Sequence, residues 1–156
     1  MRRSLLLFTM VAFGSLAGCD AQPGKVTTHP VHGQILYDGK AAAGVRVFLL
    51  PTSAPAPPEV PMNPHGVTGS DGRFALSTYI EGDGAAEGAY QIILFWPPET
   101  KEGEEESRDD RLFGWYSAVQ SKMTIEVKPG DNAVPTLNLP YRKGPPPKSE
   151  GVPGRN

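Results

Sequence analysis

The feature that most constrains the fold of this chain is a series of short runs in which every second residue is apolar. In one of them, Val45, Val47 and Leu49 alternate with more polar or outward-facing positions. Successive side chains of a β-strand point to opposite faces, so this spacing is typical of strands that are buried on one side. The predicted strands are 31–37, 45–49, 65–69, 73–77, 89–96, 123–128 and 134–139.

The composition supports this interpretation. The 156 residues include 18 Gly and 17 Pro, which is too many for a helical protein and lacks the period of collagen. Seven short strands separated by turn residues predict an all-β fold, a single antiparallel β-sandwich of immunoglobulin or prealbumin type. Cys19 is the only cysteine. The predicted sandwich therefore has no internal disulfide and depends on its hydrophobic core.

The first residues have the pattern of a secretory signal peptide. Arg2 and Arg3 precede an apolar run at 5–13, and small residues follow. A membrane-spanning helix needs about 20 apolar residues, and Gly14 and Ser15 interrupt this run well before that length. We therefore expect residues 1–18 to be a leader and not part of the fold.

Leu16, Ala17, Gly18 and Cys19 resemble the lipobox of bacterial lipoproteins. The resemblance implies that the Cys19 thiol is diacylated and that the chain is cleaved before it. Two acyl chains hold a protein stably on a membrane. The expected partner is thus the lipid bilayer, and the expected location is extracytoplasmic, with the membrane and leaflet left open.

The sequence predicts four segments. They are a signal peptide at 1–18, a lipidated cysteine and flexible tether at 19–28, a β-sandwich at 29–140, and a disordered Pro/Gly-rich tail at 141–156.

Several turns in the predicted sandwich, in this order, resemble carboxypeptidase-regulatory-like domains. The matching residues are Gly33, the 37–40 turn, Gly44, Val47, Leu49, Pro51, Thr68, Asp71-Gly72, Phe74, Gly82-Asp83-Gly84, Gly88, Tyr90, Ile92, Tyr116, Ser121 and 127–132. Gly69 departs from the pattern, because an aspartate is usual there. The resemblance implies a transthyretin-like sandwich and an accessory role without a catalytic site.

Charge and motifs exclude several functions. A net charge of −2 without clustered Lys or Arg argues against nucleic-acid binding. No nucleophile elbow, zinc-binding helix motif or phosphate-binding loop occurs, so we expect no enzyme activity and no cofactor. Residues 141–144 weakly resemble the C-terminal tetrapeptide of hydroxyisourate hydrolases, but the last two residues differ and no matching histidine motif is recognisable.

Metal binding is also not expected. His29 and His32 are three residues apart and would point to opposite faces of a strand, and His65 lies far along the chain. The acidic run 102–110 is interrupted by Arg108 and matches no calcium loop. We interpret it as a solvated loop, with calcium binding left open.

The aromatic residues Trp96, Trp115 and Tyr116 flank this acidic run and form the one predicted interaction surface. Packing against the sandwich is their simpler role. The sequence thus predicts a non-catalytic module with a structural or protein-interaction role in the cell envelope. The alternative is a carbohydrate- or other ligand-binding module that uses these loop rings.

Overall fold

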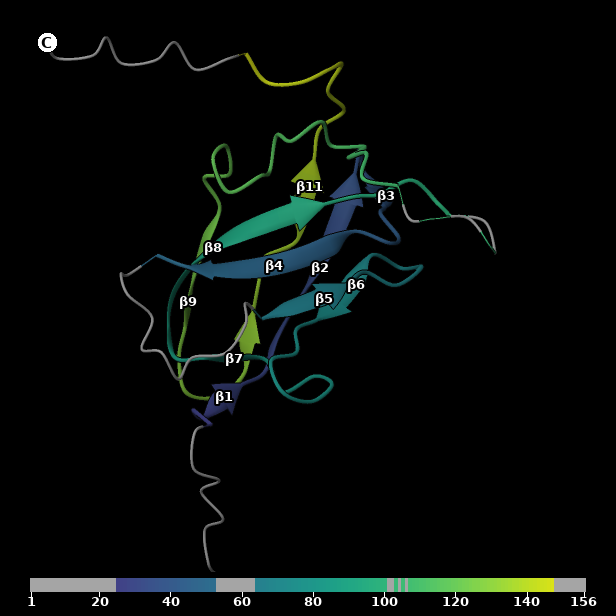
Figure 1. Ribbon diagram of the computed structural model, residues 1–156. Coiled ribbons are helices and arrows are strands. Elements are labelled where there is room, and N and C mark those ends of the chain that lie inside the picture. The colour runs from purple at the N-terminus through teal and green to yellow at the C-terminus, as the bar shows by residue number, and fades with distance from the viewer. Residues whose placement is uncertain (1–24, 53–63, 101–102, 104, 106, 148–156) are drawn as a thin grey trace, which may run out of the picture.

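The described part of the molecule is built from strands and turns. The computed structural model describes residues 25–52, 64–100, 103, 105 and 107–147, and no helix occurs among them. One four-stranded sheet crosses in front of a second sheet, and a small strand pair lies at the bottom of the view (Figure 1). The prediction of an all-β fold is confirmed.

The first sheet is antiparallel and has the order β5-β4-β8-β9. Its inward positions, including Val47, Leu49, Ile92 and Leu94, alternate as predicted and are almost fully buried. These strands are β4 (Arg46–Pro51), β5 (His65–Val67), β8 (Gly88–Phe95) and β9 (Thr124–Val127).

The second sheet is organised around β2, because all of its other strands pair with that one. β3 and β6 lie along one edge of β2, and β10 and β11 lie along the other. The strands are β2 (Val31–Tyr37), β3 (Lys40–Ala41), β6 (Arg73–Ala75), β10 (Asn132–Ala133) and β11 (Leu137–Leu139). Pro135 lies in the gap between β10 and β11, at the sheet edge where a residue without an N–H is tolerated.

β10 and β11 run parallel to β2, which differs from the predicted antiparallel arrangement. After β9 the chain turns at 128–131 and crosses to the second sheet at the point where β2 begins. It then has to run in the same direction as β2. The described residues also form eleven short strands instead of seven. Apolar alternation reports which face is buried but carries no information on strand direction.

Two sequence features produce the local geometry of β2. Asp38 and Gly39 both have positive φ, 51° and 76°, as the tight turn to β3 requires. Gly33 lies under the ring of Phe74, where a Cβ would come within 2.8 Å of that ring. The glycine therefore lets β6 and its aromatic side chain pack directly on β2.

The hairpin of β5 and β6 joins the two sheets. β5 pairs with β4 in the first sheet, and β6 pairs with β2 in the second. The two arms of the hairpin meet at His65 in β5 and at Ser77, just after β6, whose backbones exchange hydrogen bonds of 3.1 and 2.8 Å. The predicted hairpin at 65–77 is confirmed, and it closes one side of the sandwich.

A small pair of strands near the start of the described chain extends the domain. β1 (Thr28–His29) pairs with β7 (Ala85–Ala86). One step earlier, the Val26 N–H donates to the Tyr79 hydroxyl at 3.0 Å. The structured region therefore begins before the predicted boundary at residue 29, because these backbone pairings reach into the predicted tether.

Candidate functional site

The aromatic residues predicted as an interaction surface come together at one end of the sandwich. We call Tyr37, Trp96, Trp115, Tyr116 and Tyr141 the aromatic cap. It is formed where β2, β8 and β11 end and by the loop before β9, at the top of Figure 1, whereas β1 and β7 lie at the bottom.

Trp96 is the buried centre of the aromatic cap, with only 7% of its surface exposed. Its Nε1 donates to the Ala43 carbonyl at 2.9 Å, and the Tyr37 ring meets it edge-on at 5.2 Å. The Arg111 guanidinium lies 3.7 Å from the centroid of the indole and covers it. Of the three predicted residues, Trp96 therefore belongs to the core and offers no free ring face.

Asp110 shapes the loop that carries Trp115. Its Oδ1 accepts hydrogen bonds from the backbone N–H groups of Trp96 and Leu112, both at 3.0 Å. Its Oδ2 accepts one from Gly114 at 2.9 Å. Asp110 belongs to the acidic run that we predicted to be a solvated loop. Its carboxylate instead has a structural role, because it fixes the turn at 110–114 against the end of β8.

Trp115 is half-buried and makes contact with residues of the predicted tail. Its Nε1 donates to the Gly144 carbonyl at 2.8 Å, and the Arg142 guanidinium lies 4.0 Å from the centroid of its ring. Tyr141 contacts Tyr37 edge-on at 6.3 Å. These contacts keep the chain on the domain through residue 144, beyond the predicted boundary at 140.

Tyr116 begins a loop that is attached to the edge of β8. The Leu94 N–H donates to the Tyr116 carbonyl at 3.0 Å, and the Ile92 N–H donates to the Met123 carbonyl at 2.9 Å. The buried Ser121 hydroxyl donates to the Ile92 carbonyl at 2.6 Å. These bonds hold the loop between Tyr116 and Met123 against β8, so that it forms a rigid wall beside that strand.

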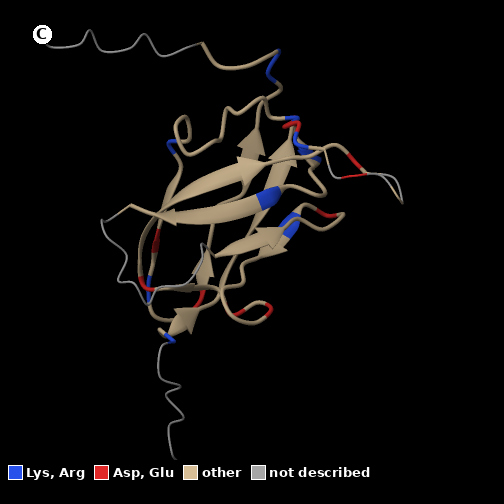
Figure 2. Cartoon of the chain, in the orientation of Figure 1, with Lys and Arg blue, Asp and Glu red and all other residues tan. Residues whose placement is uncertain are grey.

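A groove of about 280 Å³ lies between this wall and the chain after β11. Both of its charged lining residues are cations, and Figure 2 shows blue segments in the loop before β9 and after β11. We call it the cap groove; its lining residues are Trp115, Tyr116, Gln120, Ser121, Lys122, Met123 and Arg142. Sequence reasoning named Trp115 and Tyr116 but missed the two cations.

A larger hollow of about 570 Å³ lies beside the β5–β6 hairpin. Its charged lining residues, Arg73 and Glu81, have opposite signs, and Arg73 also lies 3.7 Å from Asp71. The hollow is wide and open to solvent. We place the candidate site in the smaller cap groove, because rings and like-charged groups converge there.

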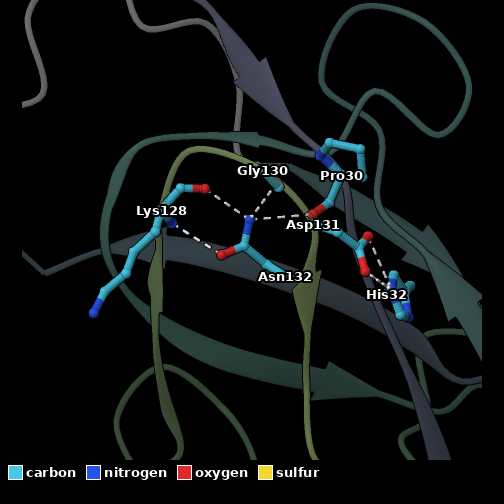
Figure 3. A network of polar contacts seen from close by, with 6 residues as sticks. All are labelled: Pro30, His32, Lys128, Gly130, Asp131 and Asn132. Carbon is cyan, nitrogen blue, oxygen red and sulfur yellow. Dashed lines mark hydrogen bonds and ion pairs between the residues drawn. The ribbon is translucent and has the colours of Figure 1, made fainter.

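The opposite end of the sandwich, which we call the β1 end, consists of β1, β7 and residues 128–132. Its centre is Asn132, whose Nδ2 donates to the carbonyls of Lys128, Gly130 and Pro30 and whose Oδ1 accepts from the Lys128 N–H (Figure 3). Asp131 pairs with His32 at 2.9 Å in the same view. Polar groups at this end thus bond to one another.

Tyr90 is a second buried polar group on the way to the β1 end. Its hydroxyl donates to the Ala86 carbonyl at 3.0 Å, and burial raises the pKa of Tyr90 above its usual value. No acid–base chemistry is needed to explain this group, since its bond connects β8 to β7.

The histidines do not converge. His29 accepts a bond from the Gly130 N–H at 3.3 Å, while His65 stacks on Phe48. In the described ranges no group of three or more His, Cys, Asp or Glu side chains could hold a metal ion. Glu102, Glu104 and Glu106 of the acidic run lie outside those ranges.

Two further sequence predictions concern the ends of the chain. Tyr141 is 65% exposed, and the small cavity between Tyr37 and Arg142 has no histidine in its described lining. Leu16, Ala17, Gly18 and Cys19 lie outside the described residues. Within the described part of the chain, no helix is long and apolar enough to cross a membrane.

No family model matches the sequence, and a search of curated proteins finds no relative. Solved structures with some similarity include a 9R-lipoxygenase from Cyanothece, with 15% identity, a TM-score of 0.43 and coverage of 86% of this chain and 19% of that one. BcpA, the major pilin subunit of Bacillus cereus, has 15% identity, a TM-score of 0.40 and coverage of 73% and 29%. A DUF3823 family protein from Parabacteroides merdae has 15% identity, a TM-score of 0.34 and coverage of 74% and 46%. The chain thus spans less than half the length of each of these proteins.

Proposed function

We propose that this protein is a lipoprotein anchored through acylated Cys19 on the extracytoplasmic side of a membrane. Its sandwich is a non-catalytic module that holds the aromatic cap away from the bilayer, where a partner in the cell envelope can reach it. The lipobox resemblance at 16–19 supports the anchor. The arrangement of the two ends of the domain supports the orientation.

The observation that carries the orientation is the attachment of the chain at Lys25 and Val26. Val26 is bonded to the Tyr79 hydroxyl, and the Lys25 ammonium lies 5.3 Å from the centroid of the same ring. From Cys19 to Val26 the chain can reach at most about 25 Å. An acylated Cys19 would therefore keep the β1 end close to the lipid and leave the aromatic cap facing outward.

The non-catalytic role is supported by how the carboxylates of the domain are used. Asp83 accepts bonds from the backbone N–H groups of Thr78, Tyr79 and Ile80, and Asp110 accepts three in the same way. Both groups hold turns. The resemblance to carboxypeptidase-regulatory-like domains, which are usually accessory, agrees with such a role.

The anchor can be tested by replacing the thiol. We expect wild-type protein to incorporate labelled palmitate and to sediment with membranes, and Cys19→Ser to lose both properties, because no other residue can form the thioether. Ala21→Ser introduces the same side chain two residues later and serves as the control that keeps both properties. Wild-type protein without label, or a membrane-bound Cys19→Ser variant, would contradict the proposal.

A further inference from the structure

We infer that the cap groove binds an acidic saccharide, with a sugar carboxylate between Lys122 and Arg142 and the sugar ring against Tyr116 and Trp115. This inference rests on the proposed function, because only an extracytoplasmic location gives the groove access to envelope glycans. It goes further because it assigns the site and the chemical class of the ligand.

The charge of the groove selects an anion. Arg142 and Lys122 are exposed, and neither has a carboxylate partner among the described residues. Among the described residues, the lining contains no acidic side chain. The Arg142 guanidinium lies 4.0 Å from the centroid of the Trp115 ring, and this contact restricts the positions of its N–H groups before a ligand arrives. A planar carboxylate matches such a fork of donors.

The rest of the lining suits a sugar. Tyr116 and Trp115 are half-buried rings, and Met123 adds apolar surface beside them. The Gln120 amide and the Tyr116 hydroxyl have no hydrogen-bond partner within the described residues. A saccharide has C–H faces that pack on rings and hydroxyls that pair with such groups.

The size and rigidity of the groove favour a sugar end group over a protein surface. A volume of about 280 Å³ lies just below the range of drug-sized pockets, about 300–1,000 Å³. A stable protein interface would need about 800 Å² from each partner. The wall between Tyr116 and Met123 is bonded to β8, so little ordering is required on binding.

The test uses trigalacturonate and its methyl ester, which keeps the sugar but removes the negative charge. Calorimetric titration of the full chain in mild detergent measures binding, and tryptophan fluorescence reports the location. We expect saturable binding of trigalacturonate and a fluorescence change that Trp115→Phe abolishes, because Trp96 is buried. We expect the ester to bind at least about tenfold more weakly.

Charge-removing variants locate the carboxylate. Arg142→Gln and Lys122→Gln are each expected to weaken trigalacturonate binding about tenfold. Lys128→Gln removes the same charge at the β1 end, where Lys128 lies 3.3 Å from Glu126, and should leave the affinity unchanged. Urea midpoints close to that of the wild type confirm that the variants are folded.

Three outcomes would overturn the inference: no binding of trigalacturonate, equal affinity for its ester, or equal weakening by Lys128→Gln. A hexaglutamate peptide that binds as tightly as trigalacturonate would also overturn it, in favour of an acidic protein segment. These measurements do not depend on Cys19, so a failed anchor and a failed groove give different results.

Discussion

The turn around Asn132 at the β1 end and the cap groove at the other end differ in how their polar side chains are paired. At the β1 end, the Asn132 side chain makes four hydrogen bonds and Asp131 pairs with His32. In the cap groove, Arg142 lies over the Trp115 ring, and neither Arg142 nor Lys122 has a carboxylate partner among the described residues. The turn around Asn132 is satisfied by internal contacts, whereas the cap groove retains donors for a ligand. Charge content alone would not separate them; partner contacts do.

The largest effect should come from the tryptophan that connects the aromatic cap to the core. Trp96→Ala is expected to lower the free energy of unfolding by about 3–5 kcal/mol, because it leaves a cavity and an unpaired Ala43 carbonyl. Trp115→Ala should cost about 1 kcal/mol, since that ring is only half-buried. Urea denaturation of both variants measures this difference. Equal losses of unfolding free energy would mean that Trp96 and Trp115 do not differ as a structural ring and a ligand-facing ring.

A pair of glycines compares the backbones of the two ends. Gly84 has φ +82° at the β1 end, and an added Cβ would collide with the His29 carbonyl oxygen. Gly114 has φ +75° in the aromatic cap, with nothing within 4 Å of an added Cβ. We expect Gly84→Ala to cost about 3 kcal/mol and Gly114→Ala about 1 kcal/mol. Thermal unfolding of the two variants measures the difference, and a larger loss for Gly114→Ala would reverse the assignment of the tighter end.

Asp83 and Asp110 allow a further comparison of the two ends, because each accepts hydrogen bonds from three backbone N–H groups of one turn. Asp83→Ala and Asp110→Ala should each cost about 2 kcal/mol in urea denaturation, because the N–H groups lose a charged acceptor. Only Asp110→Ala should also weaken trigalacturonate binding, since only this turn positions Trp115. Weaker binding by Asp83→Ala would show that the ends are coupled.

The smallest effect concerns Tyr90, which lies between the ends. Because its folded-state pKa is raised by burial, the folded protein keeps this proton where the unfolded chain loses it. The free energy of unfolding should therefore fall as pH rises above the usual tyrosine pKa of about 10 and through the raised value. Tyr90→Phe should reduce this fall and cost about 1 kcal/mol near neutral pH, where the bond to Ala86 is lost.

Urea midpoints from about pH 9 to about pH 11 measure this dependence. Tyr141→Phe removes a hydroxyl from an exposed residue and is the matched control. An unchanged alkaline profile in Tyr90→Phe would mean that other groups cause the loss of stability.

The buried faces of the strands could be predicted from the sequence, because one-sided burial imposes a period of two. Val45, Val47 and Leu49 are all buried as that period required. β1 and β7 could not be predicted, since two residues have no period. The parallel direction of β11 was missed for a different reason: it depends on where the chain crosses between the sheets.

The candidate site was predictable only in part. Trp115 and Tyr116 stood out as loop aromatics, but the sequence could not show that Trp96 is covered by Arg111. Arg142 belonged to a segment whose composition indicated a tail, and only its stacking on Trp115 places it in the groove. Trp115 and Arg142 are far apart in the sequence, and whether they meet depends on how the loop turns at Asp110.

The parallel pairing of β11 with β2 has a mechanical consequence. Ile35 lies opposite Leu137 and Tyr37 opposite Leu139, so the domain's first long strand and its last strand point the same way. Tension applied to the two ends of the domain pulls β2 from its start and β11 from its finish. The strands must then slide past one another, and their backbone bonds share the stress instead of opening one after another like a zipper.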